Sequence, residues 1–473
     1  MNELVTGLIH DKSVYRKIAI LKRLSMEEVS LTSKDLAKQL GCSNRTIINE
    51  VSELKNDLPE NWDIIGLKMK GYTLQKPPLD SLTPIIRSFL QESMTYKVFI
   101  ETFKNNYYSL EKWCQILYTN KSTLKSNLKQ YKPILTENKL KFIFSPVKLV
   151  GDEIHLRYFY KAMLFNIERY AQIISLPEEL MRQVKKNLDF FNVEIDHLLL
   201  NVMIYVSVHR ITSKNLINKK IKSTVFLTQD QSNCFNNIIA EIESYCMVKL
   251  SENEKDALNL FFFLFSDSKE QQKQDIILYL EEQNKKQYKL FIELINMLVS
   301  NNDRHDIDVE HLKLELCAEF YKFYLAKQYD FSLEYFYTPP NYLSNRLQEL
   351  YELNYNVIFK WNKSVNRNQF NISKISRMAQ MVTYILCSIY PKKNVLFIFR
   401  GDGVYEKLAY TTLKDNFGAS VNIDREADNN TKYDLVITNS NESYASDLPV
   451  LFISQNFKQK DIEYISHLLF NFN

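Results

Sequence analysis

The chain has 473 residues, of which 45% are hydrophobic and 25% are charged. These are ordinary values for globular proteins, and the length is enough for about three domains or more. Only 8 Gly and 11 Pro are present, which disfavours turn-dense β architecture and favours a mainly helical, multi-domain chain. The N-terminus contains acidic residues and lacks an apolar run of signal-peptide length, so we expect a cytoplasmic protein that binds no membrane.

The six cysteines are dispersed, with no CxxC pair and no histidine at ligand spacing. We therefore expect reduced thiols, no metal site and no cofactor. The net charge is only +4, but residues 81–161 hold 13 basic and 6 acidic side chains. This segment is where a polyanion would be attracted.

Residues 1–76 predict a first winged helix-turn-helix. Thr32 and Asp35 form a capping-box pattern at the start of a short helix, and Gly41 ends that helix. Ser43 can cap the next helix, which takes the place of a recognition helix. A helical hairpin that binds nothing is the alternative interpretation.

The polar side chains near the start of the recognition helix are expected to face outward, toward base edges and phosphates. They are Ser43, Asn44, Arg45, Thr46 and Asn49, with Arg45 the best single candidate. The alternating run DIIGLKMKGYTLQKP then predicts a β-hairpin that turns around Lys70 and Gly71. Such a wing would place Lys68 and Lys70 near phosphates.

Residues 85–160 repeat this pattern and predict a second winged helix-turn-helix. One helix is expected at 96–103, a second is capped by Ser109, and a third lies in NKSTLKSNLKQYKPIL with Ile134 facing inward. A hairpin is expected to turn at Ser145 and Pro146. A basic, solvated helix is the alternative for the third helix. Its expected outward residues are Lys121, Ser122, Thr123, Lys125, Ser126 and Lys129.

With SNRTIINEV in the first module and GLKMKGYTLQKP as its wing, the chain resembles the Mga/AtxA family of transcription regulators over its whole length. The resemblance implies a DNA-binding regulator of the global or virulence-related activator type, not an enzyme. It also implies that the amphipathic helices of 165–285 and 286–390 form two PTS-regulation domains, which link transcription to carbohydrate supply. An enzyme IIB-like α/β domain then follows at 392–473.

The resemblance further implies partners and a modification. The partners are double-stranded promoter DNA, a second copy of the chain in a homodimer or higher oligomer, and phosphocarrier proteins of the phosphotransferase system. Phosphorylation of a histidine adds about two negative charges. His197 is the first candidate, and His209 and His311 are weaker ones. For each, a surface or satisfied core histidine is the alternative.

The segment from 392 to 473 alternates apolar runs with helical patterns, which predicts a mainly parallel sheet. Arg400 stands in the loop where enzyme IIB domains carry a phosphocysteine, and arginine cannot accept that phosphate. Gly401 and Gly403 either cradle an anion or form a bare turn. We therefore expect this domain to serve contacts, self-association above all.

Three other classes of protein remain as alternatives. A phosphotransferase component needs a cysteine or histidine in the first loop of the C-terminal domain, and the sequence has neither there. An antiterminator needs a small all-β RNA-binding head, whereas the N-terminal patterns here are helical. A DNA-silent scaffold would use its winged modules for protein contacts, and a gel shift with promoter DNA separates it from a DNA-binding regulator.

Overall fold

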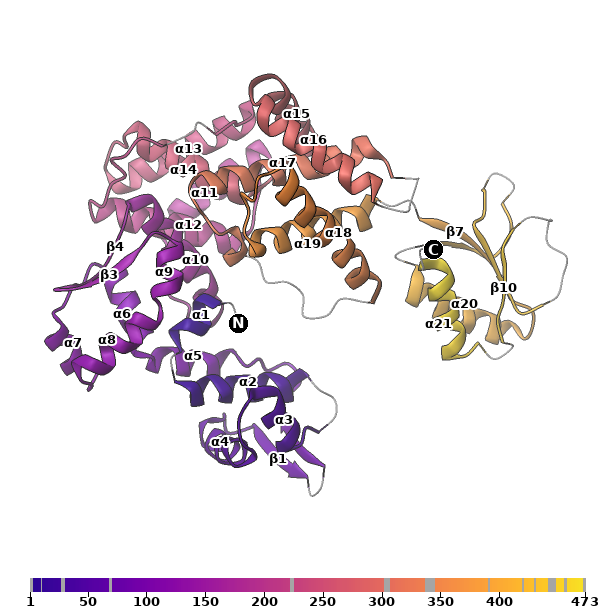
Figure 1. Cartoon of the computed structure of the whole chain (residues 1–473), viewed down its shortest axis with the longest axis horizontal. Coiled ribbons are helices and arrows are strands. Elements are labelled where there is room, and N and C mark those ends of the chain that lie inside the picture. The colour runs from indigo at the N-terminus through magenta and orange to yellow at the C-terminus, as the bar shows by residue number, and fades with distance from the viewer. Residues whose placement is uncertain are drawn as a thin grey trace. The chain divides into compact units, whose positions relative to one another are not determined.

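The computed structural model describes residues 3–9, 11–26, 30–67, 70–221, 225–301, 307–336, 345–389, 392–418, 421–428, 431–440, 448–454 and 457–470. Contacts divide the chain into two compact units. The first unit is Met1–Ile276 with Glu319–Pro339, and the second is Ile277–Ala318 with Pro340–Asn473. Figure 1 shows that helices form most of the chain and that a small sheet lies in its C-terminal part.

The first module is a winged helix-turn-helix, as the sequence predicts. Local capping sets its helix boundaries. Thr32 and Asp35 form a complete capping box, Gly41 adopts a left-handed φ of 63°, and the Ser43 hydroxyl accepts the Thr46 N–H. In chain order the elements are α1 (Glu3–Leu8), α2 (Lys12–Met26), α3 (Ser33–Leu40), α4 (Asn44–Asp57), β1 (Asp63–Leu67) and β2 (Gly71–Gln75).

The wing of this module is tied to Leu31, two residues before the start of α3. Strands β1 and β2 are antiparallel, with Leu67 opposite Gly71. Leu31 and Tyr72 exchange two backbone hydrogen bonds, with N···O distances of 3.0 and 2.8 Å. Gly71 is required at this crossing because its φ is +104° and a Cβ atom there would lie 2.3 Å from the Leu31 carbonyl oxygen.

The second module repeats the architecture, and Ser109 caps its second helix by accepting the Lys112 N–H. Hairpin β3–β4 turns at Ser145 and Pro146, as predicted. The elements are α5 (Thr83–Glu92), α6 (Met94–Phe103), α7 (Leu110–Ile116), α8 (Lys121–Gln130), α9 (Lys132–Glu137), β3 (Lys141–Phe144) and β4 (Val147–Val150).

One prediction for this module is wrong, because the expected third helix is two helices. Helix α8 ends at Gln130 and α9 begins at Lys132, with Pro133 in its first turn. In a continuous helix Pro133 would lack the N–H that bonds the Lys129 carbonyl, and its ring would strike that carbonyl. Ile134 is consequently half-buried, and Leu135 is the buried residue of α9.

A long buried helix, α10 (Glu153–Ala171), continues directly from the second module. Every residue from Ile154 to Ile167 is buried. The remaining helical elements of the first unit are α11 (Glu178–Phe191), α12 (His197–Thr212), α13 (Gln229–Cys246), α14 (Glu252–Phe265), α15 (Glu270–Gln283), α17 (Val309–Gln328) and η1 (Leu333–Phe336), of which α15 and α17 continue into the second unit. Helix α12 and the 3-10 helix η1 pack against α10, and α13 packs against α11, α12 and α14. Strand β5 (Glu194–Ile195) pairs with β6 (Ser266–Asp267).

The second unit contains a helical part and a sheet. Helices α16 (Lys285–Ser300), α18 (Asn345–Ser364) and α19 (Ile372–Ile389) pack together, and the Trp361 indole N–H donates to the Leu290 carbonyl at 3.1 Å. The strands are β7 (Lys393–Ile398), β8 (Val421–Asp424), β9 (Leu435–Thr438) and β10 (Val450–Phe452), and the helices of the same part are α20 (Gly403–Phe417) and α21 (Gln459–Phe470).

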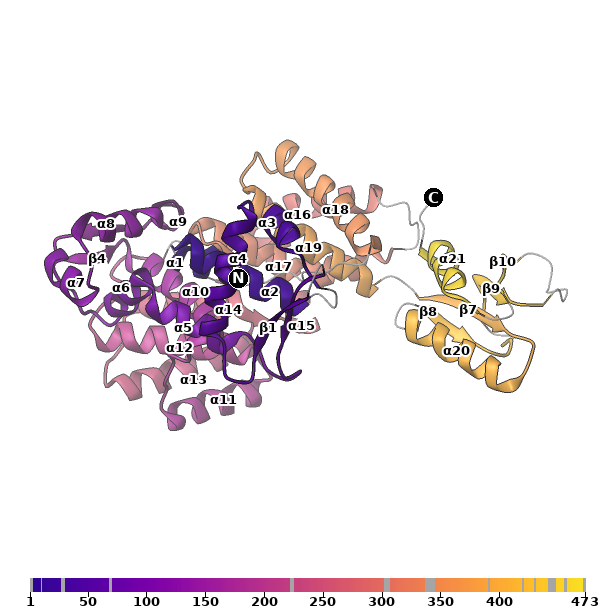
Figure 2. The ribbon, with the colours of Figure 1, turned by 90° about the horizontal axis from the view of Figure 1, so that it is seen from below.

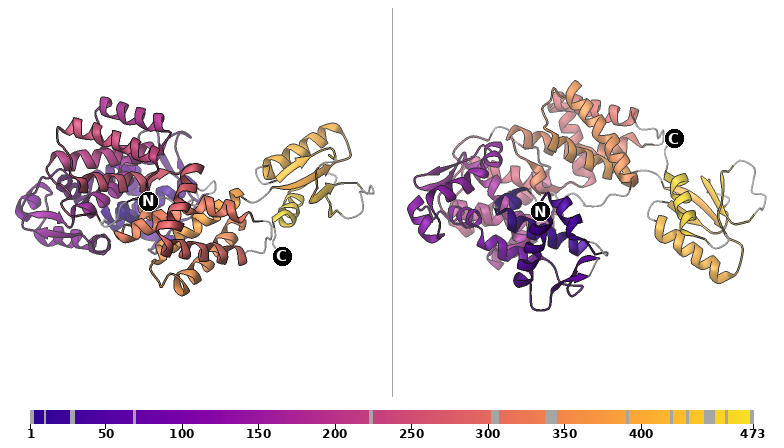
Figure 3. Two further views of the ribbon diagram at one scale, coloured as in Figure 1. Left: turned by 90° about the horizontal axis from the view of Figure 1, so that it is seen from above. Right: turned by 60° about the horizontal axis from the view of Figure 1, so that its bottom comes forward.

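The four strands form a parallel sheet in the order β10-β9-β7-β8. Val395 and Phe397 of β7 point to the face covered by Leu413 of α20 and Ile465 of α21. Figures 2 and 3 show α20 lying along this sheet. The mainly helical, multi-domain chain with N-terminal helix-turn-helix domains and a small C-terminal parallel sheet is therefore confirmed. Within the described part of the chain, no helix is both long and apolar enough to cross a membrane.

Candidate nucleic-acid interface

Helix α4 and its N-cap Ser43 expose four of the five polar residues predicted for the first recognition helix, and the fifth, Thr46, is partly exposed. Asn44, Arg45 and Asn49 are exposed, and Arg45 has no ion-pair partner among the residues that the structure describes. The other two are engaged with each other, because the Ser43 Oγ accepts the Thr46 N–H at 3.1 Å and lies 2.8 Å from Thr46 Oγ1. Arg45 and Asn49 are therefore the side chains most available to a ligand.

A partly buried ion pair fixes α4 against α2. Glu50 is 4% exposed, and its carboxylate accepts hydrogen bonds from the Arg16 guanidinium, with Nε at 2.9 Å from Oε1. This hydrogen bond raises the pKa of Arg16. This pair was not predicted, although an acid on the apolar stripe of an amphipathic helix is a signal for it in the sequence. Lys17 adds bonds to the outer residues Glu53 and Asp57 at 3.0 and 3.3 Å.

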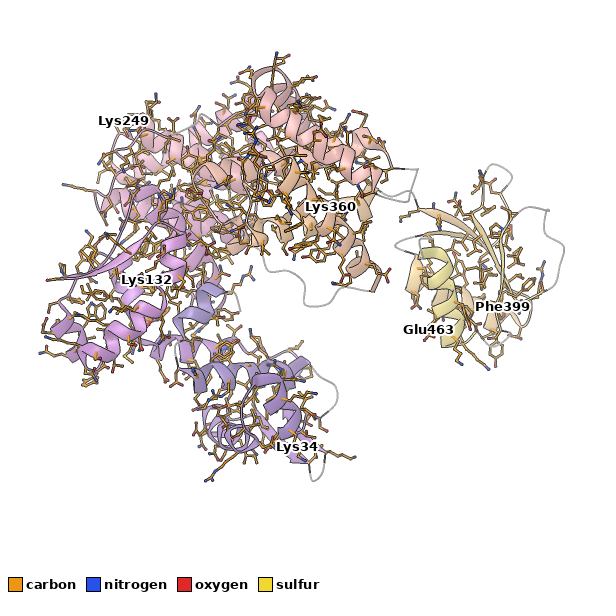
Figure 4. The ribbon with its side chains drawn as sticks, in the orientation of Figure 1. Lys34, Lys132, Lys249, Lys360, Phe399 and Glu463 are labelled. Carbon is orange, nitrogen blue, oxygen red and sulfur yellow. The ribbon has the colours of Figure 1, made fainter. Side chains whose placement is uncertain are left out.

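The wing of the first module presents Lys70, which is exposed at the hairpin turn. The Ser30 hydroxyl donates to the Lys70 carbonyl at 2.7 Å, so the turn is anchored to the segment before α3. Lys68, the other predicted wing residue, lies outside the described residues. Figure 4 shows Lys34 of the first module and Lys132 of the second, both of which are exposed.

Helix α8 presents a basic face in the second module. Its N-terminus is capped by the Asn120 side chain, which accepts the Thr123 N–H at 2.8 Å. Leu124 and Leu128 are 0% and 1% exposed and hold the helix on the module core. All six predicted outward residues are exposed or partly exposed, namely Lys121, Ser122, Thr123, Lys125, Ser126 and Lys129.

The three lysines of this face differ in how they are paired. Lys121 forms an ion pair with Glu111 of α7, and this bond lowers the pKa of the Glu111 carboxyl to about 2. The Lys125 Nζ lies 5.8 Å from the Phe144 ring centroid in the wing. Lys129 has no ion-pair partner in the described ranges. One of the three charges is therefore locally neutralised in the unbound protein.

Helix α12 joins the second module to the helical region through its C-terminal end. His209 Nε2 lies 3.0 Å from the Phe103 carbonyl oxygen, and its ring lies 4.5 Å from the Phe103 ring. Arg210 donates to both oxygens of Glu153, at 2.8 and 2.6 Å. Burial lowers the pKa of His209. This histidine is therefore part of a packed junction.

A second buried charge network lies beside this junction. Arg157 is 0% exposed and donates to both oxygens of Glu254, at 2.7 and 2.9 Å. It also donates to Glu153 at 3.1 Å, so Glu153 is shared with the Arg210 pair. The paired residues of this network come from α10, α12 and α14. Residues far apart in the sequence are therefore bound into one charged cluster.

The three candidate histidines have different surroundings. His197 is exposed at the first position of α12, and it lines two adjoining hollows of about 520 and 660 Å³ that also include Lys185. His311 is also exposed, and its Nε2 lies 3.9 Å from a Glu315 oxygen. His209 is half-buried. The structure therefore leaves His197 and His311 accessible.

The first loop of the C-terminal domain carries Arg400 and Asp402. Asp402 occupies the N-cap of α20, and its carboxylate accepts the Val404 N–H at 2.8 Å. That N–H is a donor that an anion at the helix start would need, so the arrangement disfavours an anion cradle at Gly401 and Gly403. Among the described residues, no group of three or more His, Cys, Asp or Glu could hold a metal ion.

Comparison with known proteins gives matches that fit this geometry. Residues 80–165 match the Mga helix-turn-helix domain, and residues 16–73 match a helix-turn-helix domain family. The chain is similar to the capsule synthesis positive regulator AcpB of Bacillus anthracis, at 22% identity over 97% of this chain and 99% of that protein.

Two other proteins of Bacillus anthracis match over shorter stretches. The capsule synthesis positive regulator AcpA is 27% identical over 36% of this chain and 33% of its own length. The anthrax toxin expression trans-acting positive regulator is 22% identical over 55% of this chain and 56% of its own length.

Proposed function

Because the chain is a DNA-binding transcription regulator of the Mga/AtxA family and not an enzyme, we propose that it activates virulence-related genes and that carbohydrate supply controls this activity. The observation that carries the proposal is the pair of outward recognition-helix faces. Arg45 and Asn49 are exposed on α4, and Lys125 and Lys129 are exposed on α8. Such faces suit base edges and phosphates of duplex DNA.

The sign of regulation rests on the relatives. AcpB, AcpA and the toxin regulator are each described as positive regulators. We extend that sign and the virulence setting to this chain. The winged modules at 1–76 and 85–160 are proposed to bind promoter DNA. The helical segments at 165–285 and 286–390 are proposed as PTS-regulation domains.

His197 is proposed to accept a phosphoryl group, which phosphocarrier proteins of the phosphotransferase system would donate. Its exposure supports this role, and a phosphoryl group there would lie at the N-terminus of α12, where the helix dipole favours negative charge. Lys185 lines the same hollows and provides a cation. The other end of α12 contacts the second winged module through His209. The helix thus offers a route from the acceptor to the DNA-binding region.

The enzyme IIB-like domain at 392–473 is proposed to mediate homodimer or higher oligomer formation. Val404, Tyr405 and Leu408 of α20 support this role, because they are 74%, 63% and 61% exposed. Exposed apolar residues at such spacing are suited to a protein interface. Sedimentation of Tyr405→Lys with Leu408→Glu should give a lower mass than the unchanged chain, and an unchanged mass would count against this role.

The test of the main proposal is a gel shift combined with a reporter assay. The full chain should bind promoter duplexes, and its expression should raise reporter transcription. Arg45→Ala with Lys125→Ala should lose both effects. A chain that binds no duplex DNA under any salt condition would instead support the scaffold alternative.

A further inference from the structure

Helix α4 exposes one hydrocarbon side chain where its other apolar residues are buried. Ile47, Val51 and Leu54 are 0%, 2% and 0% exposed, whereas Ile48 is 49% exposed. The backbone of α4 is regular from Asn44 to Asp57, so the exposure of Ile48 follows from its place on the helix. An isoleucine at this position contributes little to the core of the module.

The neighbours of Ile48 on the outward face are polar. Arg45 lies one turn before it, Asn49 follows it, and Ser52 lies one turn after it, and all three are exposed. This setting differs from the apolar face of α20, where exposed apolar residues lie together. A single hydrocarbon between a guanidinium and an amide is a poor protein-docking patch. Ile48 is suited instead to contact a polar surface that carries isolated methyl groups.

We propose that Ile48 contacts the C5-methyl group of a thymine in the major groove and makes the first module selective for A·T base pairs. The proposal rests on the proposed DNA-binding function. Thymine is distinguished in the major groove by this methyl group, and an apolar side chain is its natural partner. Asn49, the next residue, has the amide that pairs with adenine N6 and N7.

The second module provides an internal contrast. The two leucines of α8 are both buried, and its other residues are polar or basic. Helix α8 therefore has phosphate-binding side chains and lacks an exposed hydrocarbon among its described residues. Thymine selectivity is accordingly assigned to α4, and general affinity to α8.

Replacing thymine by uracil in DNA tests the contact, because it removes the methyl group and preserves base pairing. The probe is a duplex selected by the full-length protein from random-sequence DNA, made once with thymine and once with uracil throughout the selected site. The unchanged protein should bind the uracil duplex about fourfold more weakly for each methyl contacted. Ile48→Ala should bind both duplexes equally, because the partner of the methyl is gone.

Matched variants separate the possible outcomes. Ile116→Ala, which also removes an exposed isoleucine, should keep the preference for the thymine duplex, and Ile48→Val should keep part of it. If Ile48→Ala retains the full preference, or changes only the sedimentation mass, the inference is overturned. Failure of the unchanged protein to select any duplex would instead contradict the proposed function itself.

Discussion

Glu111 of α7 and Lys121 of α8 form an ion pair across the turn of the second helix-turn-helix. Lys121 is one of three lysines spaced four residues apart on the proposed phosphate-binding face. Glu111 is ionised at neutral pH, as an ordinary glutamate is, and the bond to Lys121 lowers its pKa further, to about 2. The carboxylate therefore competes with DNA phosphate for the Lys121 ammonium group.

This pair predicts that Glu111→Gln strengthens binding to all duplex DNA. The freed lysine should neutralise one more phosphate, so the slope of log affinity against log salt should steepen by about 0.9. Titrations from about 50 to 200 mM salt measure this slope. Glu179→Gln is the matched control, because Glu179 is also in an exposed ion pair, with Arg182 on α11. Equal salt slopes for Glu111→Gln and Glu179→Gln would be evidence that α8 does not contact DNA.

Removing the basic side chains of the two recognition helices should change DNA binding in different ways. Lys121→Ala with Lys125→Ala should weaken binding to all sequences about equally and flatten the salt slope by about 0.9 for each phosphate that is no longer neutralised. Arg45→Ala should cost about 1–3 kcal/mol at the preferred site alone, if it reads a base. Binding to the selected duplex and to an unrelated duplex is compared for each variant. Full affinity of the double lysine variant would be evidence against a DNA-binding second module.

Gly71 should be irreplaceable in the first wing. Gly71→Ala places a Cβ atom 2.3 Å from the Leu31 carbonyl oxygen at a φ of +104°, and backbone strain of this kind alone costs about 1–3 kcal/mol. The thermal midpoint of unfolding and the DNA affinity should both fall. Gly66→Ala is the control, since its Cβ would meet only the Tyr72 ring at 3.7 Å. Comparable losses in both variants would show that the Leu31 crossing is not the cause.

The buried Arg157–Glu254 pair should dominate the stability of the junction between the second module and the helical region. Glu254→Gln leaves a buried guanidinium short of its counter-charge, which should lower the free energy of unfolding by about 3–5 kcal/mol. Glu252→Gln on the same helix changes a side chain that is 84% exposed and should have an effect within about 0.5 kcal/mol. Urea unfolding monitored by circular dichroism measures both. Similar values for the two would contradict the importance of the buried pair.

Buried His155 and half-buried His209 predict that the first unit loses stability in mild acid. Burial lowers the pKa of His155 and His209 below the ordinary 6.5. Below about pH 6.5 the unfolded chain therefore binds more protons at these histidines than the folded chain does. The free energy of unfolding is highest above about pH 6.5 and decreases as pH falls toward the lowered pKa values. The urea midpoint should drop between about pH 7 and 5.5. The double variant His155→Gln with His209→Gln should show a smaller drop. If its urea midpoint instead depends on pH as that of the unchanged protein does, these two histidines are not the cause.

Local features of the sequence were sufficient to predict much of the fold. Thr32, Ser43 and Ser109 are caps that act on an N–H only three residues away, so their roles could be inferred from spacing alone. The hairpins and the parallel sheet also follow from short apolar patterns. The break between α8 and α9 was missed although Pro133 marks it, because the apolar spacing continues across the proline.

What the sequence determined by itself is therefore the order of elements, their caps and the residue types on each helix face, all of which depend on neighbours a few residues apart. Tertiary structure decided which of those residues are exposed and unpaired, and so available to a ligand. It pairs Lys121 with Glu111, joins Arg157 to Glu254 across 97 positions, and leaves Ile48 half exposed beside buried Ile47. These outcomes depend on which distant segments pack together, because burial and ion pairing are set by atoms close in space and not by spacing along the chain.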